Sequence, residues 1–239
     1  MMSWHSFVLT TDFGVRSLTA TVMTAGVTCI YFFLPVYFFS YFIAGAIAYL
    51  FVCEWIPHVM YPAYHFYGTE RGFWPLFFSF MTPFYPALPC YFLFHLSWAY
   101  PFFFPILFLV ITAHDTAAYM IGKKIGRHKC APSISPHKSW EGAIAGFCVT
   151  MLCVKILYFF YRVEQSWLFI IFISFVISVM CVGGDLFESW IKRKIGIKDF
   201  GTLLPGHGGV LDRCDALLFM GTLTFIFRKW LISVLGAFL

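Results

Sequence analysis

Long apolar runs dominate the pattern of hydrophobic and polar positions along the chain. The run from Trp167 to Val182 contains few polar residues, and these do not alternate with apolar ones as in the strands of a membrane β-barrel. A helix crosses a bilayer with about 20 apolar residues and satisfies its own backbone hydrogen bonds in lipid. The pattern therefore predicts an all-α fold, a polytopic bundle of membrane helices.

We predict about seven membrane spans (six to eight), with bounds good to about 2–4 residues. The predicted spans are Leu18–Leu34, Tyr41–Ile56, Phe73–His95, Trp98–Ile121, Ala143–Tyr161, Trp167–Leu186 and Arg213–Leu235. Because Pro83, Pro86 and Pro89 fall in the third span, we expect that helix to be kinked, broken or re-entrant. The whole chain, 1–239, is expected to form a single integral membrane domain.

Composition and charge support this interpretation and orient the chain. Hydrophobic residues make up 61% and charged residues 11% of the sequence, whereas soluble domains carry about 25% charged residues. Ten of the 16 Lys and Arg residues fall in two loops, with members Lys123, Lys124, Arg127, Lys129, Lys138, Lys192, Arg193, Lys194, Lys198 and Arg213. Two predicted spans separate the loops, so both lie on one side, and the positive-inside rule predicts a cytoplasmic location for them and for the N-terminus. Basic loops can be topology signals alone, but that does not explain the acidic residues, serines and glycines in the same stretches.

Polar residues at helical spacing follow the sixth predicted span. Asp185, Glu188, Ser189 and Lys192 stand at i, i+3, i+4 and i+7, so they share one face if the helix continues. A carboxylate at the depth of Asp185 is costly in a membrane unless it is paired or metal-bound. This face is therefore a candidate functional surface.

A glycine-rich turn and two further carboxylates come next. Gly206, His207, Gly208 and Gly209 precede a new apolar run, and glycine-rich backbone at a helix start can cradle a phosphate, although glycines also make ordinary turns. Asp212 and Asp215 follow at i, i+3 spacing and, with Asp185, would supply the hard oxygen ligands that Mg²⁺ prefers. The alternative is a network of ion pairs with Lys192, Arg193 and Arg213.

Clustered carboxylates, basic residues and a glycine-rich turn suit phosphoryl or nucleotidyl transfer, in which a protein mainly positions groups and neutralises charge. The same stretch resembles the signature of the phosphatidate cytidylyltransferase family, also called CDP-diacylglycerol synthase. The matching residues are Ser189, Lys192, Arg193, Lys198, Asp199, Pro205, Gly206, His207, Gly208, Gly209, Asp212, Arg213 and Asp215. A second matching stretch contains Asp115, Ala118, Tyr119, Gly122, Gly126, Arg127, Ser135, Pro136, Lys138, Ser139, Glu141 and Gly142, with His137 where the family commonly has a second lysine.

The resemblance implies synthesis of CDP-diacylglycerol and pyrophosphate from CTP and phosphatidic acid, with Mg²⁺ and K⁺ as a second cation. It makes residues 112–219 the catalytic core and leaves 1–111 as less diagnostic N-terminal helices. Carried over by position, Asp185, Asp212 and Asp215 are metal candidates, joined in catalysis by Ser189, Lys192 and Arg193. The candidates for substrate and phosphate binding are Asp115, Lys138, Lys198, His207, Gly208, Gly209 and Arg213. The resemblance also implies a homodimer in membrane lipid, in a bacterial inner membrane or an equivalent endomembrane, and no nucleic-acid partner.

Two alternatives remain open at this stage. A CTP-dependent lipid or polyprenol kinase would use similar groups but transfer the γ-phosphoryl group, and a transporter would also carry charges in broken helices. Other conspicuous side chains have ordinary structural explanations: Glu54 as a paired or interfacial carboxylate and His114 as a core histidine. The eight cysteines lack CxxC spacing and are interpreted as small buried side chains.

Overall fold

The computed structural model describes residues 36–65, 72–100, 103–160, 162, 164–201 and 209–229. The predicted span Leu18–Leu34 lies outside these residues, as do the candidate site residues His207 and Gly208. Five helices of the described chain are long and apolar enough to cross a membrane: Ile43–Met60, Phe73–Ala99, Pro105–Ile125, Trp140–Phe160 and Trp167–Ile195. The predicted helical membrane architecture is confirmed, whereas a total of seven spans and a cytoplasmic N-terminus stay predictions.

The described residues fall into two compact units. Unit 1 contains the described residues up to Phe80 together with Ile197–Cys214, and unit 2 contains Met81–Gly196 and the described residues from Asp215 onward. One helix, α9 (Leu211–Ile226), begins in unit 1 and continues in unit 2. The signature stretch at the start of α9 is therefore divided between two structural settings.

Unit 1 starts with a helix that changes its winding. α2 (Val36–Tyr49) continues without a break into a π-helix, η1 (Leu50–Met60), and then into the short α3 (Tyr61–His65). Long stretches of π-helix are rare, and π-bulges occur frequently at functional sites. Leu50, Glu54, Trp55 and Val59 form the buried face of η1.

The third predicted span is interrupted at its prolines, as expected. α4 (Phe73–Met81) is followed by a π-helical turn (Pro83–Ala87) and then by α5 (Leu88–Ala99). Within the turn, Tyr85 has φ −150° and ψ 122°, which is extended and not helical backbone. Proline has no N–H to donate and its ring crowds the preceding turn, so clustered prolines break the helix here.

Unit 2 is built around two helices in close contact, α6 (Phe103–Ile125) and α7 (Trp140–Phe160). Glycines on α7 allow the approach: a Cβ atom on Gly142 would lie 2.6 Å from the carbonyl oxygen of Ala118, and one on Gly146 2.6 Å from Nε2 of His114. α7 also packs against α8 (Trp167–Ile195) around a buried group that includes Val154, Tyr158 and Ile170.

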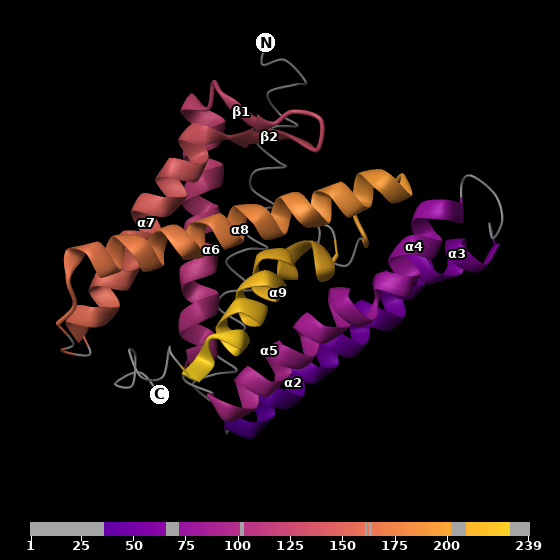
Figure 1. The fold of residues 1–239 in the computed structure, drawn as a ribbon, viewed down its shortest axis with the longest axis horizontal. Helices are drawn as coiled ribbons and strands as arrows, with labels where there is room; N and C mark the ends of the chain where they lie inside the picture. The colour runs from indigo at the N-terminus through magenta and orange to yellow at the C-terminus, as the bar shows by residue number, and fades with distance from the viewer. Residues whose placement is uncertain are drawn as a thin grey trace, which may run out of the picture. The chain divides into compact units, whose positions relative to one another are not determined.

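A small antiparallel hairpin connects α6 to α7, which the all-α prediction did not include. β1 (Lys129–Ala131) pairs with β2 (Ser135–Ser139), and Figure 1 shows the hairpin beyond the adjoining ends of the two helices. Glu141 holds its base, because the carboxylate accepts the backbone N–H of His128 at 3.1 Å and lies 2.6 Å from Nδ1 of the same residue. The connection is thus an ordered structure and not a loose polar loop.

α8 is nine residues longer than the predicted span that ended at Leu186. It runs to Ile195 and stops at Gly196, which adopts the left-handed conformation (φ 78°) that favours glycine. At its start the hydroxyl of Ser166 accepts the N–H of Phe169 at 3.3 Å and caps the helix. The extension places the polar residues from Asp185 to Lys192 on a regular helix, as the spacing predicted.

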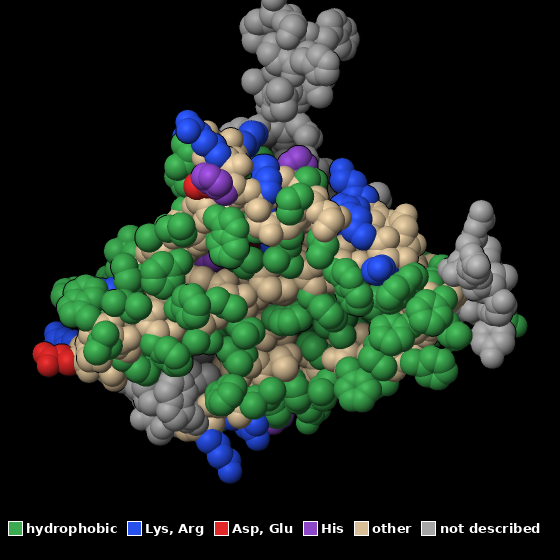
Figure 2. All heavy atoms as spheres, turned by 45° about the horizontal axis from the view of Figure 1, so that its top comes forward, with side chains coloured by type: hydrophobic (Ala, Val, Ile, Leu, Met, Phe, Trp, Pro, Cys, Tyr) green, Lys and Arg blue, Asp and Glu red, His purple; other side chains and the backbone are tan. Residues whose placement is uncertain are grey.

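The outer faces of these helices are apolar. Large hydrophobic side chains are exposed on α7 and α8, among them Leu152, Phe159, Leu168, Phe172 and Phe175. In Figure 2 hydrophobic side chains cover most of the visible face, and Lys and Arg side chains lie mainly at its edges. Contiguous apolar surface of this kind suits contact with lipid and not with water.

Candidate active site

The candidate site in unit 2 is built from α6, the hairpin and α8. Asp115 projects from α6 with its side chain 52% exposed, and Asp185 projects from α8 with its side chain 42% exposed. Lys138, on β2, places its Nζ atom 2.5 Å from Oδ2 of Asp185 and donates a second bond to the carbonyl oxygen of Val182 at 3.3 Å. The hairpin therefore places the positive charge of Lys138 beside Asp185, a carboxylate on the membrane helix α8.

Asp215 joins this group from α9. A Cβ atom on Gly184 would lie 3.0 Å from the carbonyl oxygen of Asp215, so the backbones of α8 and α9 meet at the residue before Asp185. The buried Asp215 carboxyl is repelled by the charges of Asp185 and Asp115 and attracted by that of Lys138. Its Oδ1 atom also accepts the N–H of Ala216 at 2.7 Å.

Three carboxylates and one lysine leave an excess of negative charge in the group. Like charges at short range disfavour joint ionisation unless a cation lies between them. The donors are all carboxylate oxygens, which suit a hard ion such as Mg²⁺ that keeps waters and shares substrate phosphates. The residue types of this group therefore suit a divalent metal, although among the described residues the set whose ligand atoms lie within 4.8 Å of one another is His114, Asp115 and Cys181.

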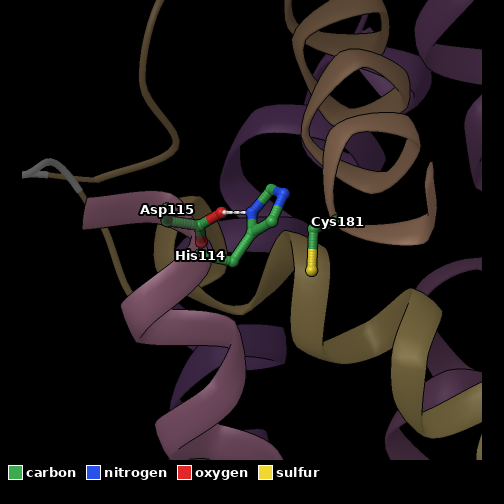
Figure 3. A group of neighbouring side chains, drawn as sticks. All are labelled: His114, Asp115 and Cys181. Atoms are coloured by element: carbon green, nitrogen blue, oxygen red, sulfur yellow. Dashed lines mark hydrogen bonds and ion pairs between the residues drawn. The ribbon is translucent and has the colours of Figure 1, made fainter. Parts of the chain in front are cut away.

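A histidine and a cysteine lie beside Asp115 (Figure 3). Nδ1 of His114 lies 3.0 Å from Oδ1 of Asp115, and Cys181 on α8 belongs to the same group, with one ligand atom of each residue within 4.8 Å of the others. His114 is 1% exposed, and its Nε2 atom has no hydrogen-bond partner among the described residues. The hydrogen bond from the buried His114 orients the carboxylate of Asp115.

The last turns of α8 carry the polar residues that the spacing predicted. Glu188 and Lys192 are both buried and form an ion pair of 2.9 Å, and Ser189, beside them, is also buried. Arg193 is exposed at the end of the same helix. Lys192 is thus neutralised in part by Glu188, which limits the free positive charge that it offers to a phosphate.

Asp212 has a different environment, in unit 1. Its Oδ2 atom accepts the N–H groups of Gly209 at 2.7 Å and Phe200 at 3.0 Å, so the carboxylate connects the segment that follows α8 to the start of α9. The next two amides, of Val210 and Leu211, donate to the carboxylate of Glu54 at 2.6 Å each. Among the amides of the predicted phosphate cradle, the three described ones, of Gly209, Val210 and Leu211, are therefore paired with protein carboxylates.

The structure thus divides the sequence-predicted site residues. It brings together Asp115, Lys138, Asp185 and Asp215, and it gives the carboxylate of Asp212 to backbone amides. Lys198 and Arg213 are exposed in unit 1. Sequence reasoning missed the contacts of Glu54 and the position of Cys181; a lone charge in an apolar run marks Glu54, but no local pattern distinguishes Cys181 from other buried cysteines.

Comparisons with known proteins bear on the identity of the chain. A model of the cytidylyltransferase family matches residues 13–231. A phosphatidate cytidylyltransferase from Staphylococcus aureus (strain COL) is 43% identical over 114 residues, which are 47% of this chain and 44% of the relative. One from Brucella suis biovar 1 (strain 1330) is 40% identical over 121 residues, which are 51% of this chain and 44% of the relative. The alignments therefore cover less than half of each relative's length. Because the family model spans most of the chain, the chain belongs to the cytidylyltransferase family.

Proposed function

We propose that the chain is a CTP:phosphatidate cytidylyltransferase, which forms CDP-diacylglycerol and pyrophosphate from CTP and phosphatidic acid. Membership of the cytidylyltransferase family supports this, as does the name phosphatidate cytidylyltransferase that its relatives carry. The observation that carries the proposal is the position of Asp185 on α8, which pairs with Lys138 and follows Gly184, where the backbone of Asp215 on α9 approaches. The charge of Asp115 on α6 also acts on the Asp215 carboxyl. Carboxylates and a cation in a membrane protein suit a reaction in which every reactant is a phosphate.

In the proposed reaction a phosphate oxygen of phosphatidic acid attacks the α-phosphorus of CTP. The new bond joins that oxygen to the α-phosphorus, and the bond from the α-phosphorus to the bridging oxygen of the β-phosphate breaks, so pyrophosphate leaves with the electron pair. The attacking oxygen is already anionic at neutral pH, so the reaction requires relief from charge repulsion and not a strong base. Lys138 supplies positive charge inside the site, and Arg193, exposed near the end of α8, is suited to contacts with the triphosphate.

Mg²⁺ belongs to the proposal as the cofactor, with K⁺ as a second cation. Asp185 and Asp215 would hold the Mg²⁺. We place Asp115 third, instead of the predicted Asp212, because the Asp212 carboxylate already accepts two amides. When bound, the ion would supply charge balance for the triphosphate and the leaving pyrophosphate. The exposure of Asp115 and Asp185 lets a headgroup approach while the acyl chains stay in lipid.

The proposal places the reaction at the cytoplasmic face of a bacterial inner membrane or an equivalent endomembrane, in a homodimer. Two helices, α7 and α8, separate the hairpin from the basic end of α8, so both lie on one side, and their Lys and Arg residues favour the cytoplasm. Cys130 in β1 can report the side in a variant that keeps no other cysteine. Burial raises the pKa of the Cys130 thiol, so a membrane-impermeant maleimide is best applied above neutral pH. Labelling in inside-out vesicles but not in intact cells is expected; the reverse contradicts the orientation.

The decisive assay uses purified protein, phosphatidic acid, Mg²⁺ and CTP labelled at either the α- or the γ-phosphorus. We expect the α-label in the lipid product and the γ-label in pyrophosphate. Transfer of the γ-label to lipid would establish a kinase instead, and lipid flux in proteoliposomes without CTP turnover would establish a transporter. Chemical cross-linking in detergent at low protein concentration tests the homodimer.

A further inference from the structure

A fully buried carboxylate outside the signature stretch contacts the start of α9. Glu54, in the π-helix η1, is 0% exposed, and its two oxygen atoms each accept one backbone N–H, Oε1 from Val210 and Oε2 from Leu211, at 2.6 Å. The N-terminus of a helix attracts an anion because its first amides lack partners within the helix. A buried carboxylate is costly unless it is hydrogen-bonded in this way, so the two bonds hold Glu54 and α9 firmly together.

Two glycines leave room for this carboxylate. A Cβ atom on Gly209 would lie 2.5 Å from Oε1 of Glu54, and one on Gly201 would lie 2.9 Å from the same atom. Neither residue has a positive φ in the structure. The approach of Glu54 therefore explains glycine at these positions, where the backbone conformation alone does not require it.

Neighbouring contacts extend the same network. Phe200 is fully buried against the rings of Trp55 and His58, with centroid distances of 5.9 Å and 6.2 Å. The carboxylate of Asp212 accepts the N–H groups of both Phe200 and Gly209 and so connects the two residues. Glu54 and its neighbours on η1 thus fix the backbone at both ends of the stretch 202–208, which contains the signature residues His207 and Gly208.

We infer that Glu54 is a positioning residue for cytidylyl transfer: its carboxylate fixes the backbone of Val210 and Leu211 at the start of α9, and thereby the helix that carries Asp215. The inference rests on the proposed function and adds to it a residue from the N-terminal half of the chain. Glu54 itself touches backbone and not substrate. A 1 Å displacement of a group remote from the chemistry can lower turnover by about 100-fold, which makes such a residue measurable.

The first experiment compares Glu54→Gln with wild type and with Cys53→Ser, an exposed neighbour on η1. Glutamine has the same shape, but its amide group presents a donor to one of the two N–H donors. We expect kcat to fall about 10- to 100-fold in Glu54→Gln, at a temperature where thermal scans show every variant fully folded, while Cys53→Ser keeps the wild-type kcat. A purely structural role would lower the melting temperature and leave the kcat of the folded protein unchanged, which would overturn the inference. Absence of cytidylyl transfer in the wild type would instead refute the proposed function.

The second experiment is a double-mutant cycle, which also serves if Glu54→Gln does not fold. Gly209→Ala pushes the carboxylate away and is expected to lower kcat to a similar extent. In a Glu54→Ala background the added methyl group has space, so Gly209→Ala should cost almost nothing further. If Gly209 instead serves the substrate phosphate, the two losses multiply, and that result would overturn the inference.

Discussion

Asp212 and Asp215 lie one turn apart on α9, yet their carboxylates have opposite surroundings. Asp212 accepts two backbone N–H groups in unit 1, whereas Asp215 faces the charges of two other carboxylates in unit 2. Both are buried, and both belong to the same signature. Both residues are aspartates of one motif, so the sequence alone does not distinguish them. Only the groups that each carboxylate contacts in the structure do.

The difference indicates how to separate structural from ion-binding carboxylates in such a protein. A carboxylate that already accepts backbone amides stabilises the backbone and has fewer lone pairs left for a metal. A carboxylate held beside others keeps its lone pairs and needs a cation. The comparison can be tested by substitutions that keep shape and change either charge or hydrogen bonding.

The largest effect is expected for Asp215→Asn. The amide keeps the size of the side chain but removes a charge from the carboxylate group, so turnover should fall by at least about 100-fold while the protein stays folded. Initial rates with labelled CTP, together with a thermal unfolding scan, measure the two properties. Glu164→Gln, an exposed acidic residue between α7 and α8, is the matched control. Full activity in folded Asp215→Asn would remove Asp215 from the mechanism.

Lys138→Met should have the next largest effect. It deletes the cation beside Asp185, so we expect kcat to fall about 10- to 100-fold. The remaining carboxylates then attract a cation more strongly, so the Mg²⁺ concentration for half-maximal activity should decrease. Lys155→Met is the control, since that lysine lies over the ring of Trp167, with Nζ 4.6 Å from its centroid. An increased Mg²⁺ requirement in Lys138→Met would contradict the assigned role.

Asp212 gives a smaller and different result. The amides of Gly209 and Phe200 both donate to one oxygen atom of Asp212, and an asparagine carbonyl can replace that atom. Asp212→Asn should therefore cost only about 0.3–1 kcal/mol through the lost charge at the helix start, whereas Asp212→Ala strands two amides and should cost about 1–3 kcal/mol. Chemical denaturation in detergent measures both. Turnover abolished in Asp212→Asn without loss of stability would make Asp212 a metal ligand after all.

The smallest effect is expected for Ser166→Ala. The substitution removes the hydroxyl that caps α8 and should cost about 1 kcal/mol of stability, with no change in kcat because the cap lies at the far end of the helix from Asp185. Ser166→Asp restores an acceptor and should restore stability. A loss of turnover in Ser166→Ala would show that the two ends of α8 are coupled.

Much of the fold was predictable because lipid permits few structures. Long apolar runs gave the helices, and the prolines at 83, 86 and 89 gave the interruption that the structure shows at Tyr85. The hairpin between Lys129 and Ser139 was missed because short, polar strands have no hydrophobic alternation. The end of α8 was placed too early because the apolar run stops where the polar face begins, while the backbone stays helical to Ile195.

The candidate site was predictable in its residue types but not in its grouping. Spacing placed Asp185 and Asp215 on adjoining helices, and the structure brings them together with Asp115. Spacing alone could not show that Asp212, at an equivalent-looking position, points to amides of residues 200 and 209. The contact of Glu54 with Val210 spans 156 residues of sequence, and such a contact leaves no local pattern.

The room that Gly201 and Gly209 leave for Glu54 has an evolutionary consequence. A larger residue fits at Gly201 or Gly209 only if Glu54 is also replaced, so substitutions at these three positions should be inherited together. Among related sequences, a small uncharged residue in place of Glu54 should accompany alanine or serine in place of Gly209. Such paired replacements would mark lineages in which another group holds the beginning of α9.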